Sequence, residues 1–250
     1  MTIEQERVMD KVERERLFHN KRYTQETRSQ GKFYQIINQG RTIFWDHVKY
    51  LSINSNVLEY GCGSGSNGLT LSPIAKSYTG IDISDVGVKR ATLKTKNHLL
   101  NNTNYIVMNA EEMTFSENTF DLIFGIGIVH HLDIDKSMTS VSKTLKKGGT
   151  AIFWEPLGVN PFINLYRHFT PNARTPDEHP LLPKDVKVME KNFTKVEQQF
   201  FGFCVLLALP LEKTKLFTPT LNILLALDRI ILKIPGLRWL AWYSSITLKN

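Results

Sequence analysis

The sequence has little cysteine: Cys62 and Cys204 are the only two among 250 residues. Two thiols so far apart form neither a disulfide framework nor the closely spaced ligands of a metal site, so we expect no bound metal. Sparse cysteine is typical of proteins in a reducing compartment. The sequence therefore favours a cytoplasmic location.

Long hydrophobic runs are also missing. The longest covers 200–211, which is too short to cross a bilayer and contains Pro210. The first 18 residues are densely charged and lack the apolar stretch of a secretory signal. We therefore expect no secretory signal peptide and no transmembrane anchor in this sequence.

No stretch interleaves basic with aromatic residues, although the net charge is +7 and the isoelectric point about 9.3. Scattered lysines explain this charge better than a nucleic-acid-binding patch does, so we expect no DNA partner. An RNA partner or an anionic membrane surface is a weaker alternative that only the net charge supports.

The chain does contain a glycine-rich turn at 57–70, VLEYGCGSGSNGLT. A short apolar run ends at Glu59, glycines follow at positions 61, 63, 65 and 68, and apolar residues then recur at helical spacing. This is the pattern of a strand, a tight turn and a helix start, in which glycine lets the backbone close on a ligand. It predicts the entrance of a nucleotide-type pocket.

Glu59 separates two interpretations of that turn, because Gly63, Gly65 and Gly68 also fit the dinucleotide fingerprint. A carboxylate here would repel the pyrophosphate of NAD or FAD, whereas it would pair with the ammonium group of S-adenosylmethionine. The run Glu59-x-Gly61-x-Gly63-x-Gly65 resembles the first motif of the class I S-adenosylmethionine-dependent methyltransferases.

The resemblance, which extends over about 43–153, implies a set of cofactor contacts. The turn would hold the methionine end, the end of the second strand the ribose, and the end of the third strand the adenine. The implied residues are Glu59, Gly61, Cys62, Gly63, Asp82, Ile83, Asn109, Ala110 and Gly125. Asn109 departs from the aspartate that is frequent at its position in that family. Asp82 could instead cap the next helix, although Ser84 is the better candidate for a cap.

Alternating apolar and helical patterns predict the fold. We expect strands at 57–59, 77–82, 105–108, 120–128 and 150–154 with helices between them, and a helix end at 145–149. This alternation is typical of a doubly wound, Rossmann-like α/β fold. With the resemblance, it predicts a seven-stranded, mostly parallel sheet with an antiparallel last strand.

The length suits one large domain with four parts. We expect N-terminal covering helices at 1–50, an S-adenosylmethionine-binding core at 51–156, a lid insertion at 157–182, and the rest of the core at 183–250 with a helical insertion at about 204–237. Both insertions would cover the ligand edge of the sheet. Ordinary core packing and contact with a membrane interface are alternatives for their apolar residues.

Methyl transfer requires alignment and, for a hydroxyl acceptor, a base. His130 and His131 follow the fourth strand, and His179 lies in the first insertion; these are the candidate catalytic residues, although either histidine of the pair could instead pack or cap the next helix. Candidate substrate or lid residues are Tyr23, Tyr166, Arg174 and Asp177.

The sequence thus predicts a methyltransferase that uses S-adenosylmethionine, releases S-adenosylhomocysteine, and methylates a small, rather apolar acceptor by in-line transfer. The acceptor would be a secondary metabolite or a quinone-like or lipid-linked molecule. An RNA methyltransferase, an NAD-dependent oxidoreductase, and a fold that only binds a partner are the alternatives. Contact with a membrane surface and assembly with a second copy stay open.

Overall fold

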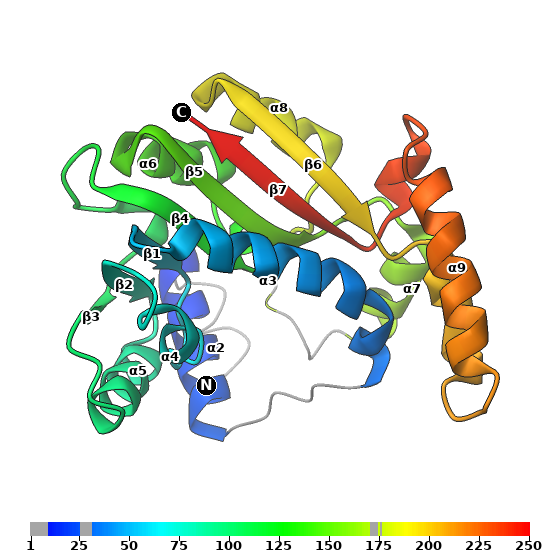
Figure 1. Ribbon diagram of the computed structural model, residues 1–250, viewed down its shortest axis with the longest axis horizontal. Helices are drawn as coiled ribbons and strands as arrows, with labels where there is room; N and C mark the ends of the chain where they lie inside the picture. The colour runs from blue at the N-terminus through cyan, green and yellow to red at the C-terminus, as the bar shows by residue number, and fades with distance from the viewer. Residues whose placement is uncertain (1–9, 26–31, 171–174, 176) are drawn as a thin grey trace.

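The computed structural model describes residues 10–25, 32–170, 175 and 177–250. Figure 1 shows one twisted sheet with helices on both faces. The strands are β1 (Asn56–Tyr60), β2 (Ser77–Asp82), β3 (Thr103–Val107), β4 (Phe120–Ile126), β5 (Leu145–Pro156), β6 (Lys195–Phe201) and β7 (Tyr243–Lys249). They lie in the order β3-β2-β1-β4-β5-β7-β6, with β7 antiparallel to both neighbours and the other pairs parallel. The predicted doubly wound α/β fold is confirmed.

Helices cover both faces of this sheet, as Figure 1 shows. The α-helices are α2 (Lys11–Gln25), α3 (Asn38–Ser52), α4 (Gly68–Leu71), α5 (Asp85–Asn97), α6 (Ile134–Thr144), α7 (Pro161–Phe169), α8 (Pro183–Asn192) and α9 (Phe217–Ile231). Short 3₁₀ helices are η1 (Lys32–Ile37), η2 (Ala110–Glu112), η3 (Val129–His131), η5 (Cys204–Leu211) and η6 (Leu237–Leu240). Apolar residues of α3 and α4 pack on one face, and those of α6 and α8 on the other.

β1 shows how burial on both faces positions the site. Val57 belongs to the core beneath α3, whereas Leu58 and Tyr60 belong to the core beneath α6. Because side chains alternate along a strand, Glu59 falls on the same face as Val57. Its carboxyl group therefore meets the hydroxyl of Tyr78 from β2.

The predicted helix end at 145–149 is wrong. α6 ends at Thr144, and β5 already begins at Leu145, which pairs with Phe120 of β4. Gly148 has a φ of +76°, so its left-handed backbone lies at an irregular start of β5 rather than at a helix cap. A glycine pair signals positive φ but does not say which element contains it.

The division of the chain into four parts stays a proposal, since one sheet draws strands from both the second and the fourth part. Within the described ranges, no helix combines the length and the apolar character needed to span a membrane. Cys62 and Cys204 are both buried and form no disulfide.

Candidate cofactor and active site

A cavity of about 640 Å³ lies at the C-terminal ends of β1, β2 and β4. The glycine turn forms one wall and α2 forms another, and Figure 1 places α2 beside α4 and α5 at this end of the sheet. Ten of the residues that the sequence singled out line it. These are Tyr23, Glu59, Gly61, Cys62, Gly63, Asp82, Ile83, Asn109, Ala110 and His131.

The glycine turn needs its glycines for two reasons. Gly63 and Gly65 have φ values of +51° and +70°, which side chains rarely adopt. A Cβ on Gly63 would lie 2.5 Å from the Tyr23 hydroxyl, and one on Gly65 would lie 2.5 Å from the Cβ of Ala91. The turn therefore lets α2 and α5 approach closely, and Gly61, Cys62 and Gly63 line the cavity.

Asp82 holds the turn in this conformation. Its Oδ2 accepts a hydrogen bond from the Gly63 N–H at 2.8 Å, and its Oδ1 accepts one from the Ser84 N–H at 2.8 Å. Burial raises the pKa of Asp82, and these two N–H donors oppose the rise. Ser84 is the cap of α5, since its Oγ accepts from the Gly87 N–H at 2.9 Å, so the alternative that Asp82 is this cap is wrong.

Glu59 has polar partners on the cavity wall. It is only 3% exposed, accepts a hydrogen bond from Asn67 Nδ2 at 2.5 Å, and accepts another from the Tyr78 hydroxyl. Burial raises the pKa of Glu59 to about 8, because these two bonds do not offset the loss of water. Without a cation nearby, the group is protonated at neutral pH, whereas the sequence suggested a standing negative charge.

This raised pKa predicts a pH dependence of stability. Because the folded-state pKa of about 8 exceeds the ordinary 4.5, only the unfolded chain releases this proton between those two pH values. As the pH rises through that window, we therefore expect Glu59 to lower the free energy of unfolding by about 1.4 kcal/mol for each pH unit. Urea denaturation of the ligand-free protein measures the slope.

Glu59→Gln is expected to remove that contribution, because the amide does not titrate. Glu117→Gln serves as the control, since Glu117 is exposed. Equal slopes of stability against pH for the wild type and Glu59→Gln would contradict the assignment.

The polar helix α2 covers the cavity and is bonded to the rest of the protein near both of its ends. Arg14 forms a bidentate ion pair with Asp177, with Nε and Nη2 each 2.8 Å from a carboxylate oxygen. At its other end, Asn20 Nδ2 donates to Asp85 at 2.7 Å, and Asn20 Oδ1 accepts from the Ser84 hydroxyl at 2.5 Å. These bonds explain why a helix with few apolar residues packs here.

Three residues meet where α2 faces η3. Oε2 of Glu15 lies 3.3 Å from Nδ1 of His131 and 3.4 Å from Nε2 of His19, and all three side chains line the cavity. Oε1 of Glu15 accepts from the Thr175 hydroxyl at 2.5 Å. Burial raises the pKa of Glu15, but His131 and His19 outweigh it and hold that pKa well below its usual range. Glu15 and His19 were not predicted from the sequence, in which their only signal is the charged N-terminal helix.

His130 has a different environment from His131. Its Nδ1 lies 2.7 Å from Oε2 of Glu155, whose Oε1 accepts hydrogen bonds from the N–H groups of Ile128 and Val129 at 3.0 and 2.9 Å. Glu155 is fully buried, and the His130 side chain does not line the cavity. The pair fixes the turn after β4. Glu155 was missed too; a carboxylate ending a buried strand is its only sequence signal.

Other predicted site residues do not reach the cavity. Gly125 lies behind Ile128, and the wall beside it comes from Ile126, Gly127 and Ile128. Tyr166 and His179 are absent from the lining, while Asp177 is held in its ion pair with Arg14. Arg174 lies outside the described residues.

The described residues of the two insertions that were predicted to form a lid lie away from this cavity. Among the described residues, none from 157–182 or 204–237 lines this cavity. η5 and α9 instead pack with η1 and α3, near the β7-β6 edge of the sheet. The strand order causes this, because it places β6 and β7 on the far side of β5 from β1 and β2. α2 covers the cavity. The insertion at 157–182 anchors α2 through the ion pair between Asp177 and Arg14.

Comparisons with known proteins agree with this geometry. Residues 58–153 match the family model described as "Methyltransferase domain". These residues are therefore similar to a methyltransferase domain, and the strand order and the glycine turn agree with that match. The predicted family resemblance is confirmed for this part of the chain.

Two curated relatives show how far the likeness extends. The ubiquinone/menaquinone biosynthesis C-methyltransferase UbiE of Rickettsia prowazekii is 34% identical over 112 residues, which are 42% of this chain and 45% of that protein. Sterol 4-C-methyltransferase strm-1 of Caenorhabditis elegans is 27% identical over 114 residues, 45% of this chain and 34% of that protein. The chain thus spans less than half the length of these relatives.

Two solved structures share the fold. The N-methyltransferase NodS of Bradyrhizobium japonicum, in complex with S-adenosylhomocysteine, has a TM-score of 0.59 and 15% identity, covering 93% of this chain and 98% of that one. Geranyl diphosphate C-methyltransferase of Streptomyces coelicolor has a TM-score of 0.60 and 11% identity, covering 85% and 78%.

Proposed function

We propose that this protein is an S-adenosylmethionine-dependent methyltransferase that acts on a small, rather apolar acceptor. The observation that carries the proposal is the cavity in which two buried carboxyl groups, Glu59 and Asp82, flank a glycine turn that forms part of the lining. Its position at the C-terminal strand ends is where doubly wound folds bind ligands. The match of residues 58–153 to a methyltransferase domain supports it independently.

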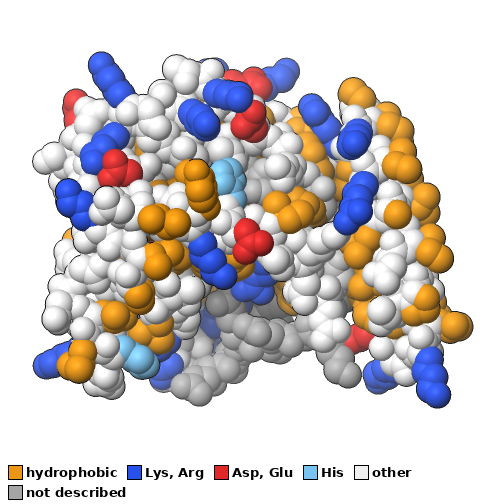
Figure 2. Space-filling model, viewed as in Figure 1, with side chains coloured by type: hydrophobic (Ala, Val, Ile, Leu, Met, Phe, Trp, Pro, Cys, Tyr) orange, Lys and Arg blue, Asp and Glu red, His pale blue; other side chains and the backbone are white. Residues whose placement is uncertain are grey.

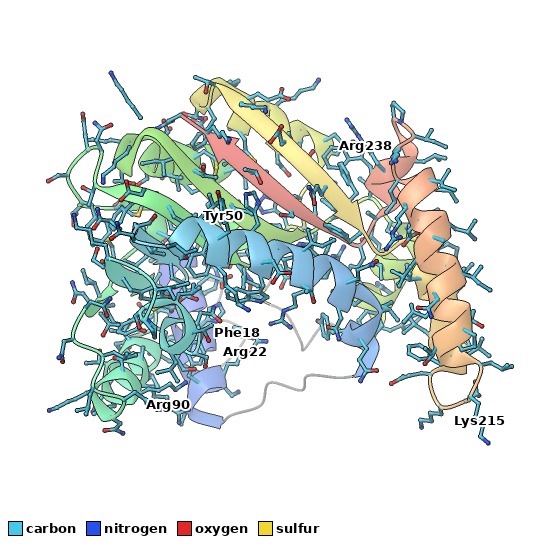
Figure 3. All side chains as sticks on the ribbon, viewed as in Figure 1. Phe18, Arg22, Tyr50, Arg90, Lys215 and Arg238 are labelled. Carbon is cyan, nitrogen blue, oxygen red and sulfur yellow. The ribbon has the colours of Figure 1, made fainter. Side chains whose placement is uncertain are left out.

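The cavity fits the donor part by part. Glu59, near the turn, would ionise and pair with the ammonium group of the methionine end, and Asp82 would accept from the ribose hydroxyls. Asn109 and Ala110 would contact the adenine. Arg22, which extends from α2 and is labelled in Figure 3, lines the cavity as a candidate partner for the donor's carboxylate.

The donor supplies a methyl group on a positively charged sulfur. In the reaction the new bond forms between this methyl carbon and a carbon or oxygen of the acceptor, while the sulfur keeps the electron pair of the broken bond. An acceptor proton must also leave. We assign its removal to His131, because Glu15 lies beside Nδ1 and leaves Nε2 to accept the proton. The chain's other task is alignment.

The acceptor class follows from the lining and from the relatives. Apolar side chains of Val12, Met108, Ile126, Ile128 and Leu132 border the cavity beside the polar contacts. The two curated relatives are named as C-methyltransferases, one of ubiquinone/menaquinone biosynthesis and one of a sterol, which supports an apolar acceptor. Of the two fold neighbours, one is named as a geranyl diphosphate C-methyltransferase and the other as an N-methyltransferase. Neither an RNA methyltransferase nor an NAD-dependent oxidoreductase finds support among these relatives.

A cytoplasmic location remains a proposal, supported by the free Cys62 and Cys204.

Isothermal titration calorimetry tests the cofactor. We expect saturable binding of S-adenosylmethionine and S-adenosylhomocysteine and no binding of NADH, because Glu59 and Asp82 would present carboxyl groups to its pyrophosphate where that anion requires cations. Incubation with isotopically labelled donor and a panel of hydroquinones, sterols and prenyl diphosphates, followed by mass spectrometry, then identifies the acceptor. Tighter binding of NADH than of S-adenosylhomocysteine would refute the proposal.

His131→Asn is expected to lower kcat about a hundredfold while changing donor affinity little, since it removes the base but no donor contact. Glu15→Gln is expected to lower kcat less, because it only weakens the orientation of His131. His47→Asn, at an exposed position on α3, is the control for histidine loss. Steady-state kinetics with the acceptor found above measures all three, and an unchanged kcat in His131→Asn would remove that assignment.

A further inference from the structure

Large apolar side chains are exposed mainly on one part of the molecule. Of the nineteen most exposed ones among the described residues, eleven lie between residues 162 and 237. Seven of these belong to η5, α9 and the segments beside them, with exposed fractions between 42% and 70%. This apolar stripe consists of Leu207, Leu216, Ile223, Leu227, Ile230, Ile234 and Leu237.

The stripe follows one face of α9. Ile223, Leu227 and Ile230 recur at four- and three-residue spacing, which places them on the same side of a helix. The neighbouring side, about 100° around the helix axis, carries Leu224 and Asp228 and is buried against the body of the protein. A helix that is apolar on its solvent side as well as its buried side is unusual for a surface freely exposed to water.

Basic residues border the stripe. Lys213, Lys215, Arg229, Lys233 and Arg238 are all exposed, and Figure 3 shows Lys215 at the foot of α9 and Arg238 near its other end. Only two acids lie within 204–240, and Asp228 is buried, where it accepts from the N–H groups of Phe203 and Cys204 at 3.1 and 2.5 Å. Figure 2 shows the apolar column along the edge of the molecule with Lys and Arg side chains beside it.

From this combination we infer that the stripe is a docking surface for an anionic lipid membrane. Apolar side chains with basic neighbours fit the boundary between acyl chains and negatively charged headgroups. α9 has 15 residues and is about 22 Å long, so it lies along the interface rather than across the bilayer. A second copy fits less well, because the cations on two copies would face one another across a symmetric contact.

Vesicle sedimentation tests the inference. We expect the wild-type protein to bind vesicles of phosphatidylcholine mixed with phosphatidylglycerol and to bind vesicles of phosphatidylcholine alone much more weakly. Ile223→Ser/Ile230→Ser is expected to weaken binding to the anionic vesicles about tenfold or more, since two apolar anchors are lost. Lys213→Glu/Lys215→Glu/Lys233→Glu is expected to remove the preference for the anionic lipid and its sensitivity to salt.

The matched control is Ile53→Ser/Ile74→Ser, which removes two exposed isoleucines from outside the stripe. Circular dichroism and binding of S-adenosylhomocysteine show whether each variant is folded, and this binding also keeps the membrane inference separate from the proposed function. Equal vesicle binding by the two isoleucine pairs, or no preference of the wild type for anionic vesicles, overturns the inference. So does light scattering that shows a dimer which Ile223→Ser/Ile230→Ser converts to a monomer.

Discussion

Replacing Asp82 by alanine is expected to weaken the binding of S-adenosylhomocysteine by about 10²- to 10⁴-fold. The carboxylate accepts hydrogen bonds from the N–H groups of Gly63 and Ser84, so its loss leaves two buried donors unpaired and releases the glycine turn. The proposed bonds to the ribose hydroxyls disappear as well. A hydrogen bond to a charged group contributes about 1.5–3 kcal/mol, so the loss of two such bonds to the ligand accounts for this expected loss of affinity.

The control for Asp82 is another strand aspartate with a similar bonding pattern. Asp121 of β4 accepts from the Asn56 N–H at 2.9 Å and from Lys146 Nζ at 2.8 Å, but it lies at the opposite end of the sheet. We expect Asp121→Ala to lower stability and leave the dissociation constant unchanged. Calorimetric titration of both variants, with melting curves to confirm folding, makes the comparison. If Asp82→Ala binds the ligand as tightly as Asp121→Ala does, Asp82 does not contact the donor.

Replacing Glu155 by alanine is expected to lower the free energy of unfolding by about 3–5 kcal/mol, because it breaks a buried interaction from one side. Glu155 is fully buried, and three groups depend on it: the N–H groups of Ile128 and Val129 and the ring of His130. Val129 and His130 are buried, so we expect water to replace these interactions poorly when the carboxylate is removed. Guanidinium denaturation at neutral pH measures the difference.

Glu155→Gln distinguishes the lost acceptor from the lost volume. The amide oxygen can still accept from Ile128 and Val129, so we expect this variant to lose about half as much stability as Glu155→Ala. Glu197→Ala is the matched control, since Glu197 lies in β6 but is exposed; its expected effect is within about 0.5 kcal/mol. A loss in Glu155→Ala no larger than in Glu197→Ala would show that the turn after β4 does not depend on this carboxylate.

Asp82 and Glu155 act on different parts of one site. Asp82 shapes the wall where the donor is proposed to bind, whereas Glu155 fixes the turn that carries His131 to the cavity. Because His130 is joined to Glu155, its neighbour His131 faces Glu15 of α2. α2 and the end of β4 therefore meet at the point where we place the removal of the acceptor's proton.

The sequence by itself determined the parallel strands β1 to β5 and the cavity wall where we place the donor. Local patterns carried this information: alternating apolar runs, four closely spaced glycines, and acids at strand ends, all within about 43–153. These features depend on residues near one another in the chain. Eight of nine predicted cofactor residues therefore line the cavity.

Only the tertiary structure decided what covers the cavity and which histidine faces it. Glu15 contacts His131, and Arg14 contacts Asp177, although more than a hundred residues separate the members of each pair. The polar helix α2 has no apolar periodicity from which such contacts could be predicted. The strand order likewise moved η5 and α9 away from the cavity and left an apolar face on α9 in solvent. An apolar periodicity identifies the apolar face of a helix, but whether that face is buried depends on which element the tertiary structure packs against it.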